Sequence, residues 1–479
     1  MMRTIQYIVI FFLFSTWVSC KKDFLEVPDK SVLLRQAYIN DLPTAEQYLR
    51  GVYLTFAGEF NSQWLMIYGD LAADNIRPTT YPILVPHYKW SLQANTEIGS
   101  FSNATVNLNY IWRAGYKIVR DCSFLIENID QYRSENEEQA NDLKAQAFTL
   151  RALTHFMLVN MFAQSYNFSE SGSHLGVPYV TISDWRQPAR RETVAKVYEN
   201  VISDLHTAES LFTATESINP TSLNWLAAKG LLSRVYLFKG DHETAKNLAI
   251  EVLAKRPIMN GANGYPLKLF TNQETEALFQ LTPASTSAGQ SVSLGFAGQF
   301  YSTSRYLASK DIADLLSLNT TDVRKIWIGA GSGGGFKITK YPTNVVPGFA
   351  APATSYYQTL LRSSEICLNA SEAYAKLGGI YEDSARFYLD AIRKRAVPST
   401  SSSTATGPAL LDSIYTERRK ELAFEGQRLY DLLRWKRPIT RLDESDPGSK
   451  TLPYPSKKAI APIPIQDVNI NGLQQNDGY

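Results

Sequence analysis

Apolar residues recur every three or four positions along much of this 479-residue chain. In residues 42–56, for example, Leu42, Ala45 and Leu49 fall on one face of a helix. The same period predicts further helices over residues 111–129, 140–162, 193–211, 222–238, 243–253, 363–377, 384–395 and 414–435. The pattern therefore predicts a mostly α-helical fold.

Two pairs of these helices share the spacing of a tetratricopeptide helix hairpin. In such a hairpin a tyrosine packs between the helices, a glycine ends the first helix, and an alanine lets the second helix approach. The positions are Tyr236, Gly240 and Ala245 and, two residues out of phase, Tyr374, Gly378 and Ala385. The irregular phase predicts tetratricopeptide-like hairpins in an α–α superhelix, not a regular solenoid.

Four stretches without helical periodicity separate the helical blocks. They are rich in Gly, Pro, Ser and Thr, which predicts loops with short strands. Loops of this length are uncommon in helical proteins unless they are functional. The stretches are residues 69–109, 257–308, 329–356 and 398–407.

The N-terminus has the pattern of a targeting signal. Arg3 precedes an apolar run over residues 7–18, which is shorter than the roughly 20 residues that a membrane-spanning helix needs. Ser19 and Cys20 follow, so residues 1–19 are predicted to be a lipoprotein signal peptide and Cys20 the lipidated N-terminus of the mature chain. Trp17 departs from the leucine usual three positions before such a cysteine. An ordinary secretory signal is the alternative.

Charge and cysteine usage exclude several classes of protein. A net charge of +2 does not favour nucleic-acid binding. The two remaining cysteines, Cys122 and Cys367, show neither a metal-binding spacing nor a disulfide framework, and we expect both to be buried. The 57 aromatic residues (27 Tyr, 22 Phe and 8 Trp) exceed what a core needs, which leaves some for a binding face.

The residue patterns that would indicate catalysis are absent or lack the sequence context that they need. Gly329, Gly331 and Gly334 spell a dinucleotide-binding pattern, but no helix pattern follows them, so we expect a turn there. The five histidines have no metal-ligand spacing, and His155, within an apolar helix, is expected in the core. No serine or cysteine nucleophile pattern is present. The sequence thus predicts a protein that is not an enzyme and needs neither cofactor nor metal. Paired carboxylates of a glycosidase, which meet only in the fold, stay open.

Residues 417–435 form the most charged predicted helix. Opposite charges three positions apart predict ion pairs within it, which favours a structural helix held in the fold over a catalytic one. The expected pairs are Arg418 with Glu421, Glu425 with Arg428, and Asp431 with Arg434.

This helix and several flanking motifs resemble the SusD/RagB family. The shared helix pattern ERR-EL-FEG-R-DL-RW is matched from Glu417 to Trp435. A proline-isoleucine-proline step and a terminal QN-G-Y pattern follow at residues 462–464 and 475–479. Cys20 with Phe24 and Leu25, Arg151 with Ala152, residues 176–180 and residues 322–324 also match in order.

The resemblance implies one domain over residues 20–479, with an N-terminal part of about residues 20–220 and a C-terminal part of about residues 260–479. It implies four tetratricopeptide-like hairpins with an appended loop-rich, ligand-binding region. It further implies a lipid-anchored, outward-facing location on the cell outer membrane. There such proteins cover a TonB-dependent, SusC-like transporter and pass it oligosaccharides or, in the RagB branch, peptides.

Starch-binding members of the family hold sugars on aromatic rings, with Arg and Asn bonding to the hydroxyls. The C–H faces of sugars pack on such rings, while sugar hydroxyls need polar partners. By this resemblance the candidate ligand-binding residues lie in or next to the loop stretches, and at each position packing in the core is the alternative to ligand contact. They are Arg77, Tyr81, Tyr88, Trp90, Asn95, Tyr301, Tyr306 and Trp327.

Capture of nutrient oligosaccharides is the function expected from these observations. Capture of oligopeptides by the same fold is the nearest alternative. A surface glycosidase would need two carboxyl groups roughly 5–9.5 Å apart in a cleft. A tetratricopeptide scaffold that binds only proteins would need a concave helical groove open to solvent.

Overall fold

The predicted mostly helical fold is confirmed by the computed structural model, which describes residues 38–60, 63–79, 85–94, 104–215, 218–282, 306–341 and 356–479. From Asp41 to Tyr479 the described residues belong to one compact unit. Within the described ranges, no helix is long and apolar enough to cross a membrane. Cys20 and the expected signal peptide lie outside the described residues.

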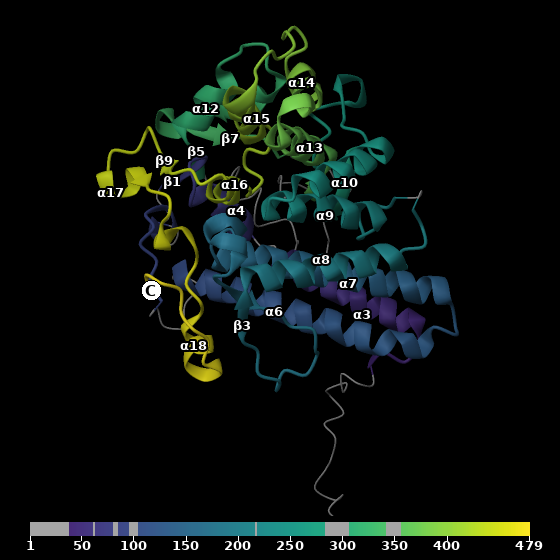
Figure 1. The fold of residues 1–479 in the computed structure, drawn as a ribbon. Coiled ribbons are helices and arrows are strands. Elements are labelled where there is room, and N and C mark those ends of the chain that lie inside the picture. Colours follow the sequence, from purple (N-terminus) through teal and green to yellow (C-terminus); the bar gives the residue numbers. More distant parts are fainter. Residues whose placement is uncertain are drawn as a thin grey trace, which may run out of the picture. The chain divides into compact units, whose positions relative to one another are not determined.

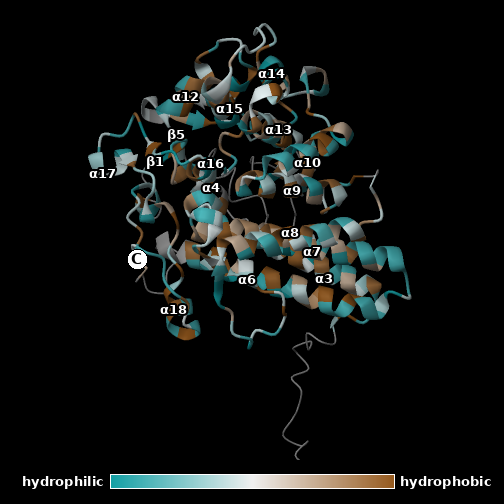
Figure 2. Ribbon diagram, viewed as in Figure 1, coloured by the Kyte–Doolittle hydropathy of each residue, from teal (hydrophilic) through white to brown (hydrophobic). Residues whose placement is uncertain are grey.

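Four helices from the N-terminal half lie side by side in the lower part of Figure 1. Each packs against the next in chain order, and in Figure 2 hydrophobic and hydrophilic residues alternate in bands along them. Such bands are typical of helices that bury one face and expose the other. The helices are α3 (Leu42–Thr55), α6 (Ala104–Asn128), α7 (Glu137–Phe162) and α8 (Val194–Leu211).

Side-chain caps explain where these and later helices begin. At each cap an Asp, Asn, Thr or Ser side chain accepts a hydrogen bond from the backbone two or three residues on, which satisfies an otherwise unpaired N–H. Asp41 and Thr44 form a reciprocal capping box at the start of α3. The other caps are Asn136 before α7, Thr193 before α8, Asn224 before α9 and Asp241 before α10.

The two predicted tetratricopeptide-like hairpins are present. They are α9 (Trp225–Lys239) with α10 (His242–Lys255), and α13 (Ser363–Leu377) with α14 (Glu382–Ala396). In each, a serine of the first helix donates to the carbonyl of the predicted alanine: Ser233 to Ala245 at 3.0 Å and Ser371 to Ala385 at 2.8 Å. Both alanines are fully buried, so the backbones approach as the spacing predicts.

The expected single helix over residues 414–435 is wrong. The chain forms α15 (Gly407–Glu421), breaks, and resumes as α16 (Arg428–Arg434). Phe424 and Gly426 have φ of 68° and 76° in the break, a conformation that no α-helix contains. The Phe424 ring is fully buried, so core packing overrides the helical periodicity.

Short strands occupy the predicted loop stretches. A four-stranded antiparallel sheet has the order β1 (Ile76–Pro78), β5 (Tyr306–Ala308), β7 (Phe336–Ile338) and β6 (Ile328–Ala330). The glycine-rich segment forms the expected turn between β6 and β7, where Gly331 N donates to Gly335 O at 2.8 Å. Separately, β4 (Ala277–Leu281) pairs with β8 (Gln358–Arg362), and β2 (Leu175–Pro178) with β3 (Arg191–Thr193).

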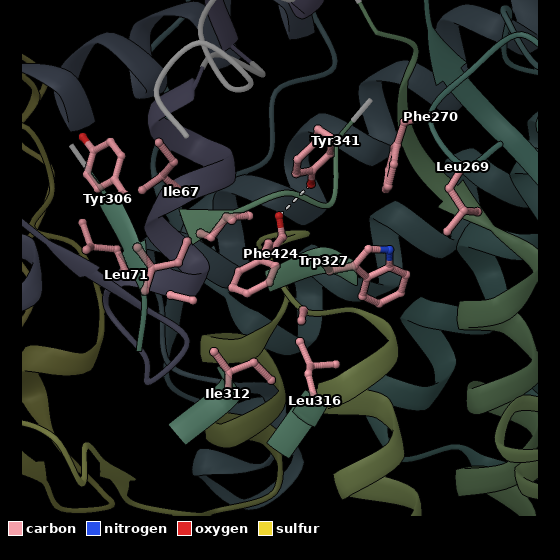
Figure 3. Packing of buried hydrophobic residues seen from close by; sticks show 14 of the residues in the cluster. Ile67, Leu71, Leu269, Phe270, Tyr306, Ile312, Leu316, Trp327, Tyr341 and Phe424 are labelled. Carbon is pink, nitrogen blue, oxygen red and sulfur yellow. Dashed lines mark hydrogen bonds between the residues drawn. The ribbon is translucent and has the colours of Figure 1, made fainter. Parts of the chain in front are cut away.

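A hydrophobic cluster beside the four-stranded sheet joins distant parts of the chain. It brings α4 (Gln63–Leu71) and α12 (Lys310–Ser317), neither of which the periodicity predicts, together with the break after α15. Figure 3 shows Phe424 near the centre of the cluster, with Ile67 on one side and Trp327 on the other. The Tyr341 hydroxyl donates to the Phe424 carbonyl at 2.7 Å. This cluster supports the region where the candidate ligand-binding residues lie.

Candidate functional site

Three of the predicted loop stretches contribute strands to the four-stranded sheet. Pro78, at the end of β1, is the register partner of Tyr306, the first residue of β5. The rings of Tyr341 and Tyr356, which bracket residues 342–355, lie 5.0 Å apart. The sheet therefore gathers ends of stretches that are more than 200 residues apart in sequence, as a composite site requires.

Arg77 is the candidate that the structure leaves most available. It lies in β1 opposite Leu307 and is half-buried. Its side chain forms no ion pair with any of the described residues. A guanidinium carries five N–H donors, which suits it to a ligand rich in acceptor oxygens.

Tyr88 and Trp90 are buried around Arg441, a residue that sequence reasoning missed. The Arg441 guanidinium lies 3.7 Å from the Tyr88 ring centroid and 4.1 Å from that of Trp90. Trp90 Nε1 donates to Ala72 O at 2.8 Å, and Arg441 donates to the carbonyls that follow α4, including Ala73 O at 2.7 Å. These contacts close the C-terminal end of α4, whose last carbonyls lack helical partners.

Tyr306 and Trp327 belong to the hydrophobic cluster of Figure 3 and are at most 1% exposed. The Trp327 ring packs edge-on against Tyr265 at 6.4 Å, and the Lys340 ammonium lies 4.0 Å from its centroid. The structure thus brings Tyr88, Tyr306 and Trp327 into one cluster with their ring faces covered. Ligand contact at these positions and at Trp90 stays a prediction, and it would require the rings to leave these partners. Tyr81, Asn95 and Tyr301 lie outside the described residues.

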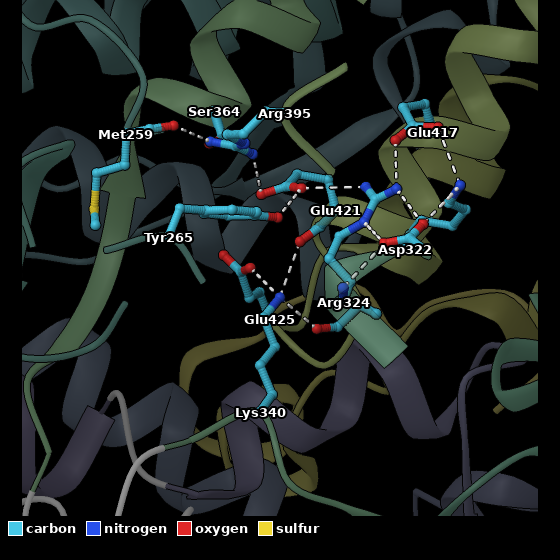
Figure 4. Close-up of polar contacts among 12 residues, drawn as sticks. Met259, Tyr265, Asp322, Arg324, Lys340, Ser364, Arg395, Glu417, Glu421 and Glu425 are labelled. Carbon is cyan, nitrogen blue, oxygen red and sulfur yellow. Dashed lines mark hydrogen bonds and ion pairs between the residues drawn. The ribbon is translucent and has the colours of Figure 1, made fainter. Parts of the chain in front are cut away.

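The charged family helix forms the buried network of Figure 4. In Figure 4, Glu421 accepts from Arg395 at 2.7 Å, from Arg324 at 3.2 Å and from the Tyr265 hydroxyl at 2.8 Å. Arg362 also donates to Glu421, at 2.8 Å. Burial by itself raises the pKa of Glu421, but the three arginines outweigh it and hold that pKa well below its usual value. The predicted structural role of this helix is confirmed.

The partners in the network differ from those that the helical spacing predicts. Asp431 pairs with Arg434 as expected, at 2.9 Å, but Arg418 also reaches Asp431 across the helix break. Glu425 pairs with Arg362 and Lys340, which come from other elements. The break after Glu421 turns these charges toward the rest of the fold, and no local spacing signals that.

This network is unsuited to glycosidic acid–base chemistry. Arg362 and Lys340 outweigh the effect of burial and lower the pKa of Glu425, as the arginines lower that of Glu421. A glycosidase needs one of its two carboxyls held protonated as the general acid. The carboxylates of Glu421 and Glu425 are instead ionised, and each is paired with more than one arginine or lysine side chain. Such pairing stabilises the fold.

The predicted core residues are where the pattern placed them. His155 is fully buried between Arg151 O and Val180 N, at 3.0 and 3.1 Å, and burial lowers its pKa to about 3. Cys122 and Cys367 are buried, and burial raises the pKa of both thiols. None of these groups is available for chemistry.

An open hollow of about 710 Å³ lies between α3, α7 and residues 219–222. Tyr53 in its wall donates to Gln146 at 2.9 Å and accepts from Leu223 N at 3.0 Å, so this polar group is already paired. The hollow is the feature that a protein-binding scaffold would use.

Two family models match the chain. One, described as "Starch-binding associating with outer membrane", matches residues 57–237, and the other, described as "SusD family", matches residues 314–479. The first match includes α6 to α8, and the second includes the charged segment over residues 417–435 and the terminal motif.

Known proteins align with almost the whole chain. The SusD-like protein P25 of Formosa agariphila is 22% identical, over 99% of both chains. Among solved structures, a putative sugar binding protein from Bacteroides vulgatus is 28% identical with a TM-score of 0.80, covering 92% of this chain and 99% of that one. A SusD superfamily protein from Bacteroides thetaiotaomicron is 26% identical with a TM-score of 0.81, covering 91% and 100%.

Proposed function

The chain belongs to the SusD family, and we propose that it captures oligosaccharides at the cell surface and delivers them to a TonB-dependent transporter of the outer membrane. The observation that carries the proposal is the match of residues 57–237 to a family described as starch-binding and outer-membrane-associated. The sugar binding protein from Bacteroides vulgatus, of the same fold, supports the ligand class.

The binding region that we propose is the edge of the four-stranded sheet around Arg77. Ends of separate loop stretches meet there. The half-buried Arg77 guanidinium, which forms no ion pair with a described residue, suits the acceptor oxygens of sugar hydroxyls. Tyr81, Asn95 and Tyr301 are the further residues that we propose for this site. Packing of sugar C–H faces on the two tyrosine rings would supply apolar contact.

Attachment to the outer membrane is the second part of the proposal. We expect lipid on Cys20 to hold the protein facing outward. Several acyl chains, each contributing about 0.8 kcal/mol per buried CH₂, anchor a protein durably. In a bacterial host, metabolic labelling with an alkyne fatty acid should mark the wild type and not Cys20→Ser. Labelling of both proteins would exclude Cys20 as the lipid site.

A binding screen tests the proposed ligand. The soluble chain from Asp23 is presented to polysaccharides, oligosaccharides and oligopeptides in affinity gels, and hits are measured by calorimetry. We expect retention by a glycan without product formation, weakened at least tenfold in Arg77→Ala or Tyr81→Ala. Arg133→Ala is the control, since that half-buried arginine lies in the connection between α6 and α7 and pairs there with the exposed Asp130 and Glu137.

Other results of this screen would indicate one of the alternative functions. Binding of peptides alone would indicate the oligopeptide role, and shortening of the polymer would indicate a glycosidase. Retention of no glycan and no peptide would overturn the capture proposal.

A further inference from the structure

A second pocket, of about 230 Å³, lies apart from the four-stranded sheet, where the C-terminal segment crosses β2 and β3. Its apolar wall includes Phe168, whose side chain is 39% exposed, and its polar wall includes Gln164, Arg191 and Lys457. The terminal family motif contributes Gln475 and Asn476 to this pocket, but none of the ligand candidates above lies in it.

Arg191 is a cation that forms no ion pair with any of the residues that the structure describes. Its guanidinium donates to Gly176 O at 2.7 Å, Gln474 O at 2.8 Å, Asn476 Oδ1 at 2.8 Å and Leu175 O at 3.3 Å. All four acceptors are neutral, and they use four of the five N–H groups, leaving one on Nη1. Burial lowers the pKa of Arg191 to about 10, which leaves it charged at neutral pH. A desolvated charge in this state is stabilised by an anion.

Lys457 adds a second positive charge at the rim. It pairs with Asp477 at 3.3 Å, but the two side chains are 68% and 77% exposed. An ion pair this exposed contributes little, so an incoming anion can replace Asp477 at small cost. His174 adds no charge, because burial lowers its pKa and its ring nitrogens already bond with Ser169 Oγ and Gln164 O.

Gln164 has a side-chain acceptor that suits a hydroxyl donor. Its Nε2 donates to Ser456 O at 2.8 Å, while its buried Oε1 accepts no hydrogen bond from the described part of the chain. The residue is 9% exposed, so this acceptor is largely withdrawn from water. A hydroxyl group that donates to Oε1 would remove the cost of leaving it unpaired.

We propose that this pocket is a subsite for an acidic sugar unit, which would use its anionic group on Arg191 and Lys457, a hydroxyl on Gln164 and its C–H face on Phe168. The inference rests on the proposed carbohydrate capture and adds a preference for glycans that carry carboxylate or sulfate groups. A hydroxyl-rich ring with one anionic substituent matches each of the four contacts, whereas a neutral sugar leaves Arg191 uncompensated.

Calorimetry with a galacturonate trisaccharide and its methyl ester tests the subsite, because the ester keeps every hydroxyl and removes only the charge. We expect the wild type to bind the acid about tenfold more tightly. Lys457→Glu should abolish that preference, whereas Phe168→Ala should weaken binding of the acid and the ester alike. Lys394→Glu, on the exposed face of α14, should retain the preference. Melting temperatures of all variants establish that they are folded.

Equal affinity for acid and ester together with equal affinity for a sulfated disaccharide and its unsulfated form, or a preference that survives Lys457→Glu, would overturn the inference. Binding of a neutral glycan in the screen above alongside that result would leave the proposed capture function standing. A sulfated disaccharide run in parallel identifies the anionic group. If it is preferred over its unsulfated form while the uronate is not, the anion subsite is supported with sulfate as its ligand.

Discussion

The backbone of Gly69 in α4 lies directly against the carbonyl of Gly426, in the break between α15 and α16. A Cβ on Gly69 would lie 1.9 Å from that oxygen. The neighbouring Asp70 accepts from Gly426 N at 2.6 Å, so the two glycines are held at this contact. The family helix is thus fixed to a helix 350 residues earlier in the chain.

Gly69→Ala should therefore destabilise the fold by about 1–3 kcal/mol or more, because the methyl group meets rigid backbone. Urea unfolding measures the change. Gly51→Ala is the control, since nothing lies within 4 Å of its Cβ in α3, and it should raise stability by about 0.5–1 kcal/mol. Equal stability of the two variants would contradict the close contact.

Glu421→Gln should cost about 3–5 kcal/mol, since it removes the shared partner of three buried arginines. Chemical unfolding of the wild type and variant gives the difference. Glu46→Gln breaks an exposed pair with Arg50 and should change stability by less than about 1 kcal/mol. A small effect at Glu421 would mean that the network of Figure 4 contributes little.

Glu274 should make stability fall as the pH rises. Burial, with Glu276 adding to it, raises the pKa of Glu274 from 4.5 to about 7. Between these values the folded state binds more protons than the unfolded state, so the contribution is full below pH 4.5 and is lost as the pH rises through 7. Its size is on the order of 3 kcal/mol.

Glu274→Gln isolates this effect, because the amide keeps an oxygen for Phe270 N and Thr359 Oγ1. Unfolding at pH 5 and pH 8 should show a larger loss of stability for the wild type than for the variant. Parallel pH dependence of the two proteins would show that Glu274 titrates normally.

Trp327→Ala should lower stability by about 3–5 kcal/mol, because it empties the centre of the cluster in Figure 3. Trp185→Ala, at a residue 74% exposed, should stay within about 0.5 kcal/mol of the wild type. If Trp327→Ala were as stable as the wild type and lost glycan binding, the ring would belong to the ligand site instead.

The sequence by itself determined most of the long helices, because their signals are local. Apolar spacing places the buried face of α3, the Asp41–Thr44 capping box marks its start, and Gly240 with φ of 91° ends α9. The hairpin pattern of tyrosine, glycine and alanine is likewise read within some 12 residues. Each of these features depends on residues that are neighbours in the chain.

Only the tertiary structure decided which charged groups pair with one another and which aromatic rings are buried in the core. Asp431 meets Arg418 because the chain breaks at Phe424, and Trp327 is covered because Lys340 and Tyr265 reach it from other elements. The pocket at Arg191 exists because residues 474–476 return to a strand 280 positions earlier. Burial and long-range contacts of this kind depend on the packing of distant segments, which no local periodicity encodes.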